Sequence, residues 1–411
     1  MSEGFSNLKV ASNFITRLEE RKIREPTDIQ RKIIPHLTSG ESVFFASATG
    51  TGKTFAYLLP FLSLMIESSH NNTGTKPCFV IIAPTLELCT QINGELDFLL
   101  SGTNIRSLLL IGSVNLDRQI ETIKKTKPDI IVGNPNRILI LAKKRILRLN
   151  PQFLVLDEAD RLVSDEMIND TFELCQIINR SKKEKNNIIF AACSATMNKK
   201  NRDKLSDIIN YKDISFIESE DHEILREKIE HWAIFSEKRR KDQTLRSLLA
   251  ALKERKSKKN KFLVFTNKGD EAGITLSKLQ HHHVSAAGLF GKISKKPISS
   301  QERKIALESF RNGSVEVLVS TDLAARGLDI QGVTHVIALD VPSDSEVYIH
   351  RCGRTARAGK RGTMITIGDE TQMHLLAAME KKLKIRVQPK ELHYGKVCAP
   401  LPIKEDEYKE N

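Results

Sequence analysis

Short apolar runs with the composition of β-strands alternate with stretches of helical spacing along the sequence. The first series of runs occupies residues 43–47, 78–83, 107–111, 129–133, 153–157, 188–193 and 214–217. Strands that alternate with helices form parallel sheets whose two faces are covered by the connecting helices. The pattern therefore predicts an α/β fold built on a parallel sheet.

A polar, acidic stretch at 218–227 interrupts this alternation, which then restarts. The second series of runs occupies residues 231–235, 261–266, 284–289, 315–320, 335–339 and 363–367. Because a chain of 411 residues exceeds one typical domain of about 150 residues, a single hydrophobic core is not expected. We predict two α/β domains, residues 1–217 and 229–411, joined by a linker at 218–228.

Composition and charge restrict the class of protein and its partners. Hydrophobic residues at 40% and charged residues at 28% are near the averages of globular proteins, which excludes a wholly disordered, collagen-like or disulfide-scaffold chain. The 64 Lys and Arg against 51 Asp and Glu give a net charge of +13. This excess favours a polyanionic partner, with nucleic acid first and an anionic membrane surface second.

The same sequence carries no sign of export or of membrane insertion. Its apolar runs fall far below the roughly 20 residues needed to cross a bilayer. Glu3, Glu19 and Glu20 stand where a signal or transit peptide would have basic and apolar residues, so we expect a cytoplasmic location, or a nuclear or nucleolar one in a eukaryote. The six cysteines show no C-x-x-C spacing, which predicts reduced thiols and no structural zinc.

The strongest local motif is Ser47-Ala48-Thr49-Gly50-Thr51-Gly52-Lys53-Thr54, which follows a β-run and opens a helical pattern. Its glycines let backbone N–H groups turn toward phosphate oxygens, and the helix N-terminus adds positive potential. Lys53 is expected to reach the β- and γ-phosphates and Thr54 to coordinate Mg²⁺. A chance match on an ordinary turn is the alternative, but the flanking strand and helix disfavour it. The segment predicts a phosphate loop.

Acidic residues end the apolar run at 153–156, in the order Asp157-Glu158-Ala159-Asp160. Ligands of open α/β sheets bind at the carboxyl edge of the strands, where these carboxylates emerge. Asp157 is expected to hold Mg²⁺ through its hydration shell, and Glu158 to orient and deprotonate the attacking water. A solvated acidic turn is the alternative, and the phosphate loop upstream argues against it.

Two arginines near the end of the second series are candidates for catalysis. Arg354 and Arg357 are three residues apart and so share one face of a helix. Their guanidinium groups suit the γ-phosphate of a bound nucleotide, which they would meet when the two domains close. A surface helix with an excess of basic residues is the alternative, disfavoured by the order of the three motifs along the chain.

These motifs resemble those of the DEAD-box family of RNA helicases, named for the sequence at 157–160. The resemblance covers nearly the whole chain and includes Pro26-Thr27-Asp28-Ile29-Gln30, Ser194-Ala195-Thr196, Thr321-Asp322, Ala325-Arg326-Gly327-Leu328-Asp329 and His350-Arg351-Cys352-Gly353-Arg354-Thr355-Ala356-Arg357. It implies two tandem RecA-like parallel-sheet domains, with ATP and Mg²⁺ bound between them and RNA across the opposite rim.

The resemblance also implies roles for individual residues. Catalysis would fall to Glu158, Lys53, Arg354 and Arg357. Gln30 would hydrogen-bond the adenine base, and the other nucleotide contacts would be Thr49, Gly50, Thr51, Gly52, Lys53, Thr54 and Asp329. Coupling of hydrolysis to strand separation would use Asp160, Ser194 and Thr196. RNA contacts would be Thr85, Gly112, Arg137, Arg303 and Thr321.

The sequence departs from the family pattern chiefly where RNA would bind. Leu86 replaces an arginine, Ser113 and Asn136 each replace a glycine, and Ser300 replaces a glutamine. In addition, Ile23 stands where an aromatic residue would stack on adenine, which predicts weaker discrimination between bases. The nucleotide contacts are thus better preserved than the RNA contacts.

The function that this resemblance implies is an ATP-dependent RNA helicase that locally unwinds or remodels RNA duplexes or RNA–protein complexes by ATP-driven domain closure. We expect a monomer that binds RNA through its backbone, with protein partners in a ribonucleoprotein and no membrane contact. Two alternatives stay open. One is a non-unwinding RNA clamp, which the altered RNA contacts suggest, and the other is a phosphate-loop ATPase that acts on protein or DNA.

Overall fold

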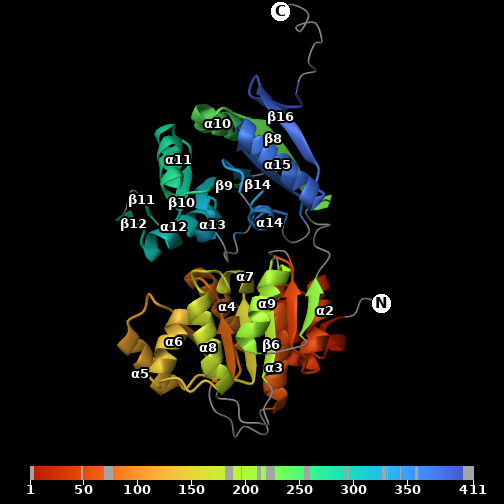
Figure 1. The fold of residues 1–411 in the computed structure, drawn as a ribbon, viewed down its shortest axis with the longest axis vertical. Coiled ribbons are helices and arrows are strands. Elements are labelled where there is room, and N and C mark those ends of the chain that lie inside the picture. Colours follow the sequence, from red (N-terminus) through yellow and green to blue (C-terminus); the bar gives the residue numbers. More distant parts are fainter. Residues whose placement is uncertain are drawn as a thin grey trace, which may run out of the picture. The chain divides into compact units, whose positions relative to one another are not determined.

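The structure is a computed structural model that describes residues 4–47, 50–68, 77–180, 188–195, 197–210, 214–218, 227–253, 260–290, 292–293, 296–325, 330, 332–342, 344–356 and 360–400. The chain forms two compact units, which divide near residue 220 (Figure 1). In the described part of the chain, no helix combines the length and the apolar character that a membrane span requires.

The first unit is built on a seven-stranded parallel sheet in the order β3-β4-β2-β5-β6-β1-β7. Its strands are β1 (Val43–Ala46), β2 (Phe79–Ile82), β3 (Ser107–Leu110), β4 (Ile130–Gly133), β5 (Phe153–Asp157), β6 (Ile189–Ser194) and β7 (Ser215–Glu218). All seven coincide, within a few residues, with the runs of the first series. The parallel pairing places the carboxyl ends of β1, β5 and β6 side by side at one edge of the sheet.

Helices cover both faces of this sheet (Figure 1). The described helical elements are η1 (Phe5–Leu8), α1 (Ser12–Glu20), α2 (Asp28–Thr38), α3 (Lys53–Ser68), α4 (Leu86–Leu100), α5 (Leu116–Thr126), α6 (Pro135–Lys143), α7 (Ala159–Leu162), α8 (Ile168–Arg180) and α9 (Lys199–Ile209). Successive residues of a strand point to opposite faces, so Val43 and Phe45 join one apolar cluster whereas Phe44 and Ala46 join the other. Both faces of β1 are therefore buried, as expected for a central parallel strand.

The second unit contains an eight-stranded sheet in the order β10-β13-β9-β14-β15-β8-β16-β17. The strands are β8 (Ile229–Phe235), β9 (Phe262–Thr266), β10 (Ala286–Leu289), β13 (Val317–Thr321), β14 (His335–Ala338), β15 (Gly362–Gly368), β16 (Val387–His393) and β17 (Lys396–Cys398). All pairs are parallel except β16 with β17. A separate two-stranded ribbon joins β11 (Lys292–Ile293) to β12 (Lys296–Pro297).

The helical elements of the second unit are η4 (Lys238–Arg240), α10 (Lys241–Leu252), α11 (Gly269–His281), α12 (Ser300–Arg311), α13 (Asp322–Ala325), α14 (Ser345–Cys352) and α15 (Glu370–Leu383). Leu245, Leu248 and Leu249 of α10 are buried in the apolar cluster of this unit. The predicted alternation thus continues through the second unit.

The sequence did not predict the last two strands, β16 and β17. Their residues include Pro389, Glu391 and Lys396, and they lack the apolar runs by which the other strands were found. Pairing with β8 holds β16 in the sheet, and β17 follows as the edge strand. Tertiary pairing, rather than local composition, determines this part of the fold.

The six cysteines are all free thiols. Cys89, Cys175, Cys193 and Cys352 are buried and Cys78 is half-buried, whereas Cys398 on β17 is exposed. Burial raises the pKa of Cys89 and of Cys175 to about 12.

Candidate active site

The loop after β1 has the backbone of a phosphate-binding loop. Gly50 and Gly52 adopt positive φ angles of 85° and 93°, which residues with a Cβ rarely adopt. A Cβ on Gly52 would also collide with the side-chain amide of Gln30. Helix α3 then begins at Lys53, so its first N–H groups lie at the loop. The glycines therefore keep open a cradle of the kind that phosphate oxygens occupy.

The side chains of this loop hold one another in place. The Lys53 ammonium group donates a hydrogen bond of 2.6 Å to the carbonyl oxygen of Ser47. Ser47 Oγ lies 2.6 Å from Thr51 Oγ1, within hydrogen-bonding distance, and the backbone N–H of Ser47 donates to the carbonyl oxygen of Ser194. Ser47 thus connects the loop to the end of the neighbouring strand β6.

Gln30 links helix α2 to the same loop. Its Oε1 accepts a hydrogen bond of 3.0 Å from the backbone N–H of Thr27, and its Nε2 donates one of 3.0 Å to the carbonyl oxygen of Gly52. The first bond is half of a capping box at the start of α2. Gln30 is 2% exposed. One N–H and one lone pair of its amide group are left for a further partner such as a base.

The carboxylate of Asp157, at the end of β5, accepts three hydrogen bonds from buried groups. Tyr57 Oη donates to Oδ2 at 2.8 Å, whereas Cys193 Sγ at 3.1 Å and the backbone N–H of Glu158 at 2.9 Å donate to Oδ1. Burial, and secondly the charge of Asp157, raise the pKa of Tyr57 and that of Cys193 well above their usual values. Both side chains therefore stay protonated and keep donating.

Tyr57 is a residue of this site that the sequence motifs do not predict. It follows Lys53 by four residues on α3, a spacing that places both on one face of the helix. Thr54 lies between Lys53 and Tyr57 on the same helix, and its side chain lowers the pKa of Tyr57 against the larger effects of burial and of the Asp157 charge. Helix α3 thus carries Thr54 and, through Tyr57, contacts Asp157, the two residues that the sequence predicts as metal-binding. Hydroxyl and carboxylate oxygens are hard donors that suit Mg²⁺.

Glu158 departs from ordinary backbone geometry. Its φ angle of 48° lies in the left-handed region, which is uncommon for a residue with a side chain. Glu158 is nevertheless 7% exposed and stands between the end of β5 and the start of α7. Backbone strain of this kind concentrates at functional sites, where the surrounding structure holds it. Asp160 follows on α7, and Ser194 is fully buried at the end of β6.

Two of the predicted RNA contacts are brought together in the first unit. The Nη2 group of Arg137 donates hydrogen bonds to the carbonyl oxygens of Gly112, at 2.8 Å, and Val114, at 3.0 Å. Arg137 on α6 therefore fixes the loop after β3. Thr85 is the N-cap of α4, where its hydroxyl accepts a hydrogen bond of 3.2 Å from the N–H of Leu88.

The other predicted residues that the structure describes lie in the second unit. Thr321 ends β13 and Arg303 is on α12. Helix α14 ends at Cys352 with Gly353 as its C-cap, so Arg354 lies beyond the helix and the prediction that a helix carries it is wrong. Arg354 is 3% exposed, and its Nε donates to the carbonyl oxygen of His350 at 3.3 Å. Four predicted site residues lie outside the described residues, namely Thr49, Thr196, Asp329 and Arg357.

Arg351 organises the second unit, a role that the sequence alone does not predict. Its side chain is fully buried. It forms a bidentate ion pair with Asp322, in which Nε and Nη2 each lie 2.7 Å from a carboxylate oxygen. It also donates to the carbonyl oxygen of Asp340 at 2.6 Å and to Asn267 Oδ1 at 2.7 Å. One guanidinium group thus holds together α14, the start of α13 and the ends of β9 and β14.

Comparison with known proteins places the chain in a family. The profile of the DEAD/DEAH box helicases matches residues 27–205, and that of the helicase conserved C-terminal domain matches residues 240–359. The fold is that of Mss116p bound to ssRNA and AMP-PNP, with a TM-score of 0.85 at 24% identity over 95% of this chain and 80% of that one. This likeness confirms the prediction of two tandem RecA-like domains.

Some curated relatives match over nearly their whole length. The chain is 34% identical to the DEAD-box ATP-dependent RNA helicase CshC of Bacillus cereus over 385 residues, which cover 93% of this chain and 92% of that protein. It is 31% identical to the ATP-dependent rRNA helicase RRP3 of Encephalitozoon cuniculi over 400 residues, covering 96% and 94%. The chain therefore belongs to the DEAD-box family of ATP-dependent RNA helicases.

Proposed function

We propose that this chain hydrolyses ATP and uses the cycle to unwind or remodel RNA duplexes or RNA–protein complexes locally, by closure of its two domains. The observation that carries the proposal is the connection of the phosphate loop to Gln30 on one side and, through Tyr57 on the helix that follows the loop, to Asp157 on the other. We assign the domains to residues 1–217 and 229–411, with 218–228 as the linker. We also propose a cytoplasmic or nuclear location, where RNA and ATP are both present.

In this proposal the first unit binds and activates the nucleotide. Lys53 exchanges its bond with the Ser47 carbonyl for a phosphate oxygen, and the glycine cradle presents backbone N–H groups to the same phosphates. Thr54 and Asp157 would hold Mg²⁺, whose charge would offset that of the phosphates. Glu158 orients the attacking water and takes up its proton.

The remaining predicted residues divide between coupling, catalysis and RNA binding. Coupling of hydrolysis to the RNA contacts would use Asp160, Ser194 and Thr196. Stabilisation of the charge on the transferred phosphate would use Arg354 and Arg357. The predicted RNA contacts would hold the sugar-phosphate backbone, and a contact to the 2′-hydroxyl would distinguish RNA from DNA. RNA is accordingly the partner, with little preference for base sequence.

A non-unwinding RNA clamp is the second candidate, and two contacts in the first unit favour it. Leu86, in place of the family's arginine, packs against the apolar cluster. Asn136 Nδ2 donates a hydrogen bond of 3.0 Å to Asp170 on α8. The side chains of Leu86 and Asn136 thus contact the protein itself, and we expect the first unit to bind RNA more weakly for that reason.

RNA-stimulated ATP turnover, measured beside strand separation on a short RNA duplex, distinguishes these functions. Strong stimulation with strand separation supports the helicase. RNA binding and stimulation without separation supports the clamp. Turnover that RNA does not change would contradict both and would leave an ATPase that acts on another substrate.

A further inference from the structure

The edge of the second sheet carries a hairpin that lies beyond the family motifs. Strands β16 and β17 pair in antiparallel fashion, with His393 opposite Lys396. Only Tyr394 and Gly395 remain to form the turn, and their φ angles are 49° and 73°. Two positive φ angles in a two-residue hairpin loop define a type I′ turn.

Tyr394 is an unexpected residue for the first position of this turn. Asn, Asp and Gly are preferred there because they tolerate the left-handed backbone, whereas a bulky side chain is strained in it. The ring of Tyr394 is fully exposed, at 105%. Within the described part of the chain it has no hydrogen bond or ring contact. Neither turn geometry nor packing accounts for an aromatic side chain at this position.

The segment that leads to and includes this exposed ring is strongly basic. Residues 381–398 contain a single acidic residue, Glu391, whose carboxylate lies 2.6 Å from His393 Nε2. The same segment contains six basic residues, namely Lys381, Lys382, Lys384, Arg386, Lys390 and Lys396. A substantial share of the chain's net charge of +13 is thus concentrated in this segment.

The base of the hairpin packs against the sheet of the second unit. Leu392 and Val397 are directly opposite each other and pack against the apolar cluster of the second unit. The Lys390 ammonium group lies 5.4 Å from the centroid of the Trp232 ring. The base of the hairpin is therefore fixed to the sheet, and its tip projects Tyr394 into solvent.

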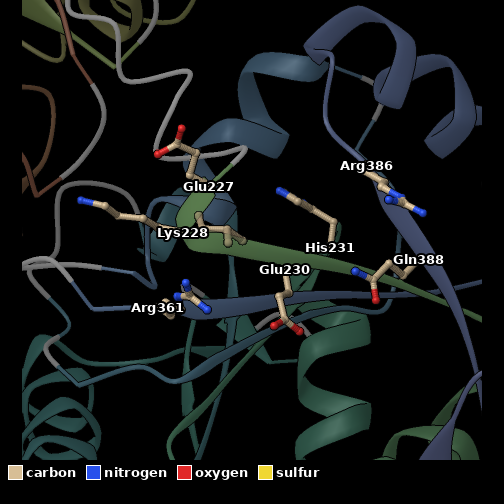
Figure 2. A pocket seen from close by; sticks show the side chains of 8 residues that line it. Glu227, Lys228, Glu230, His231, Arg361, Arg386 and Gln388 are labelled. Atoms are coloured by element: carbon tan, nitrogen blue, oxygen red, sulfur yellow. The ribbon is translucent and has the colours of Figure 1, made fainter.

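Basic side chains continue at the other end of β16. A pocket of about 210 Å³ lies there, and Figure 2 shows the side chains that line it. Lys228, Arg361 and Arg386 each directly precede one of the adjacent parallel strands β8, β15 and β16. Within the described residues none of the three forms an ion pair, although Glu227 and Glu230 share the lining. Seven residues of β16, about 20 Å, separate this cluster from the tip.

We propose that the β16–β17 hairpin is an accessory contact for single-stranded RNA, in which a base stacks on Tyr394 and the backbone phosphates meet Lys396 on β17 and the basic cluster at the start of β16. Exposed aromatic rings beside a basic track are the usual means of binding single strands without sequence preference. An acidic protein surface would form ion pairs with the lysines, but such a partner would not explain the exposed aromatic ring of Tyr394. The proposal rests on the proposed RNA function and adds a site to it.

Tyr394→Asn is the decisive variant, because asparagine fits the type I′ turn better than tyrosine does. We expect its melting temperature to equal or exceed that of the wild type, while its Kd for RNA rises at least about fivefold. The probe is a fluorescein-labelled single-stranded RNA of about 12 nucleotides, followed by anisotropy. Tyr394→Phe keeps the ring and should bind as the wild type does. A lower melting temperature for Tyr394→Asn would show a structural role and overturn the proposal.

Salt titration tests the basic part of the contact. Lys396→Gln should flatten the plot of log K against log salt by about 0.7, the amount expected for one phosphate contact on a single strand. Lys124→Gln, an exposed lysine on α5 of the first unit, is the matched control and should leave the slope unchanged. If Lys396→Gln and Lys124→Gln gave equal slopes, Lys396 would make no contact with the RNA backbone, and this part of the proposal would be overturned.

The outcomes separate this site from the function on which it rests. If the wild-type protein fails to bind the RNA, the proposed function itself fails. If the wild type binds and Tyr394→Asn binds equally well, only the hairpin contact is overturned, and its charge would then suit an acidic protein partner.

Discussion

The Tyr57 hydroxyl donates a hydrogen bond of 2.8 Å to Oδ2 of Asp157, so that helix α3 orients the carboxylate at the end of strand β5. Outer partners of this kind set the orientation of metal-binding groups, and their loss commonly costs 10- to 100-fold in metal affinity. We predict that Tyr57→Phe raises the Mg²⁺ concentration for half-saturation about tenfold. Nucleotide fluorescence measured with and without Mg²⁺ checks this, because affinity for the metal-free nucleotide should not change.

Two substitutions of Cys193, the other side chain that donates to Asp157, serve as controls for the Tyr57→Phe prediction. Cys193→Ser keeps a donor to Asp157 and should preserve Mg²⁺ affinity, whereas Cys193→Ala removes it. Cys175→Ala empties an equally buried position on α8 that has no contact with Asp157. If Cys175→Ala and Cys193→Ala shift the Mg²⁺ dependence equally, the effect is one of packing and not of orientation.

Substitutions of Lys53 and of Glu158 should have different effects on ATP binding and hydrolysis. We predict that Lys53→Ala abolishes hydrolysis, since it removes the ammonium group from the phosphate loop. Glu158→Gln should leave ATP binding intact and slow turnover by at least about a hundredfold, the scale of losing a positioned base. Equilibrium binding of a fluorescent ATP analogue, measured beside single-turnover hydrolysis, separates the two. Equal loss of binding in both variants would mean that Glu158 does not activate the water.

The ion pair between Arg351 and Asp322 should matter for stability far more than a surface pair. Arg351→Met leaves the Asp322 carboxylate without its bidentate partner, and breaking a buried pair in this way costs about 3 to 5 kcal/mol of unfolding free energy. Lys143→Met removes an exposed pair with Glu173 and should cost less than about 1 kcal/mol. Urea unfolding of the two variants compares them directly, and similar midpoints would contradict the structural role of Arg351.

His335 should make stability depend on pH. Burial lowers its pKa from 6.5 to about 4 in the folded chain, where its ring is tilted against that of Phe262 with the centroids 5.2 Å apart. As pH falls below 6.5 the unfolded chain takes up a proton before the folded one does, so stability is complete above about pH 7 and decreases toward pH 4. The loss should be on the order of 2 to 3 kcal/mol.

Substitution of His335 isolates its contribution to the pH dependence of stability. His335→Gln should flatten the dependence of the melting temperature on pH between pH 4 and 6.5, whereas substitution of the exposed His281 by Gln should not. An unchanged pH profile for His335→Gln would assign the acid sensitivity to other groups.

The sequence allowed the main elements and much of the site to be predicted, because both depend on local patterns. The strands of the first series, the phosphate loop and the acids after β5 could be read from residues adjacent in the chain. Tyr57 and Arg351 could not, since their roles come from partners 100 and 29 residues away in the sequence. The β16–β17 hairpin was missed for a related reason, because pairing with β8 stabilises a segment whose own composition is polar.

The distribution of the thiols has a practical consequence. Alkylating reagents attack the thiolate, and burial keeps the four enclosed cysteines protonated and out of reach. Cys398 is exposed and lies directly opposite Glu391 in the hairpin. A maleimide dye should therefore label the native protein first at Cys398, so the unaltered chain supplies its own attachment point for a fluorophore a few residues from Tyr394.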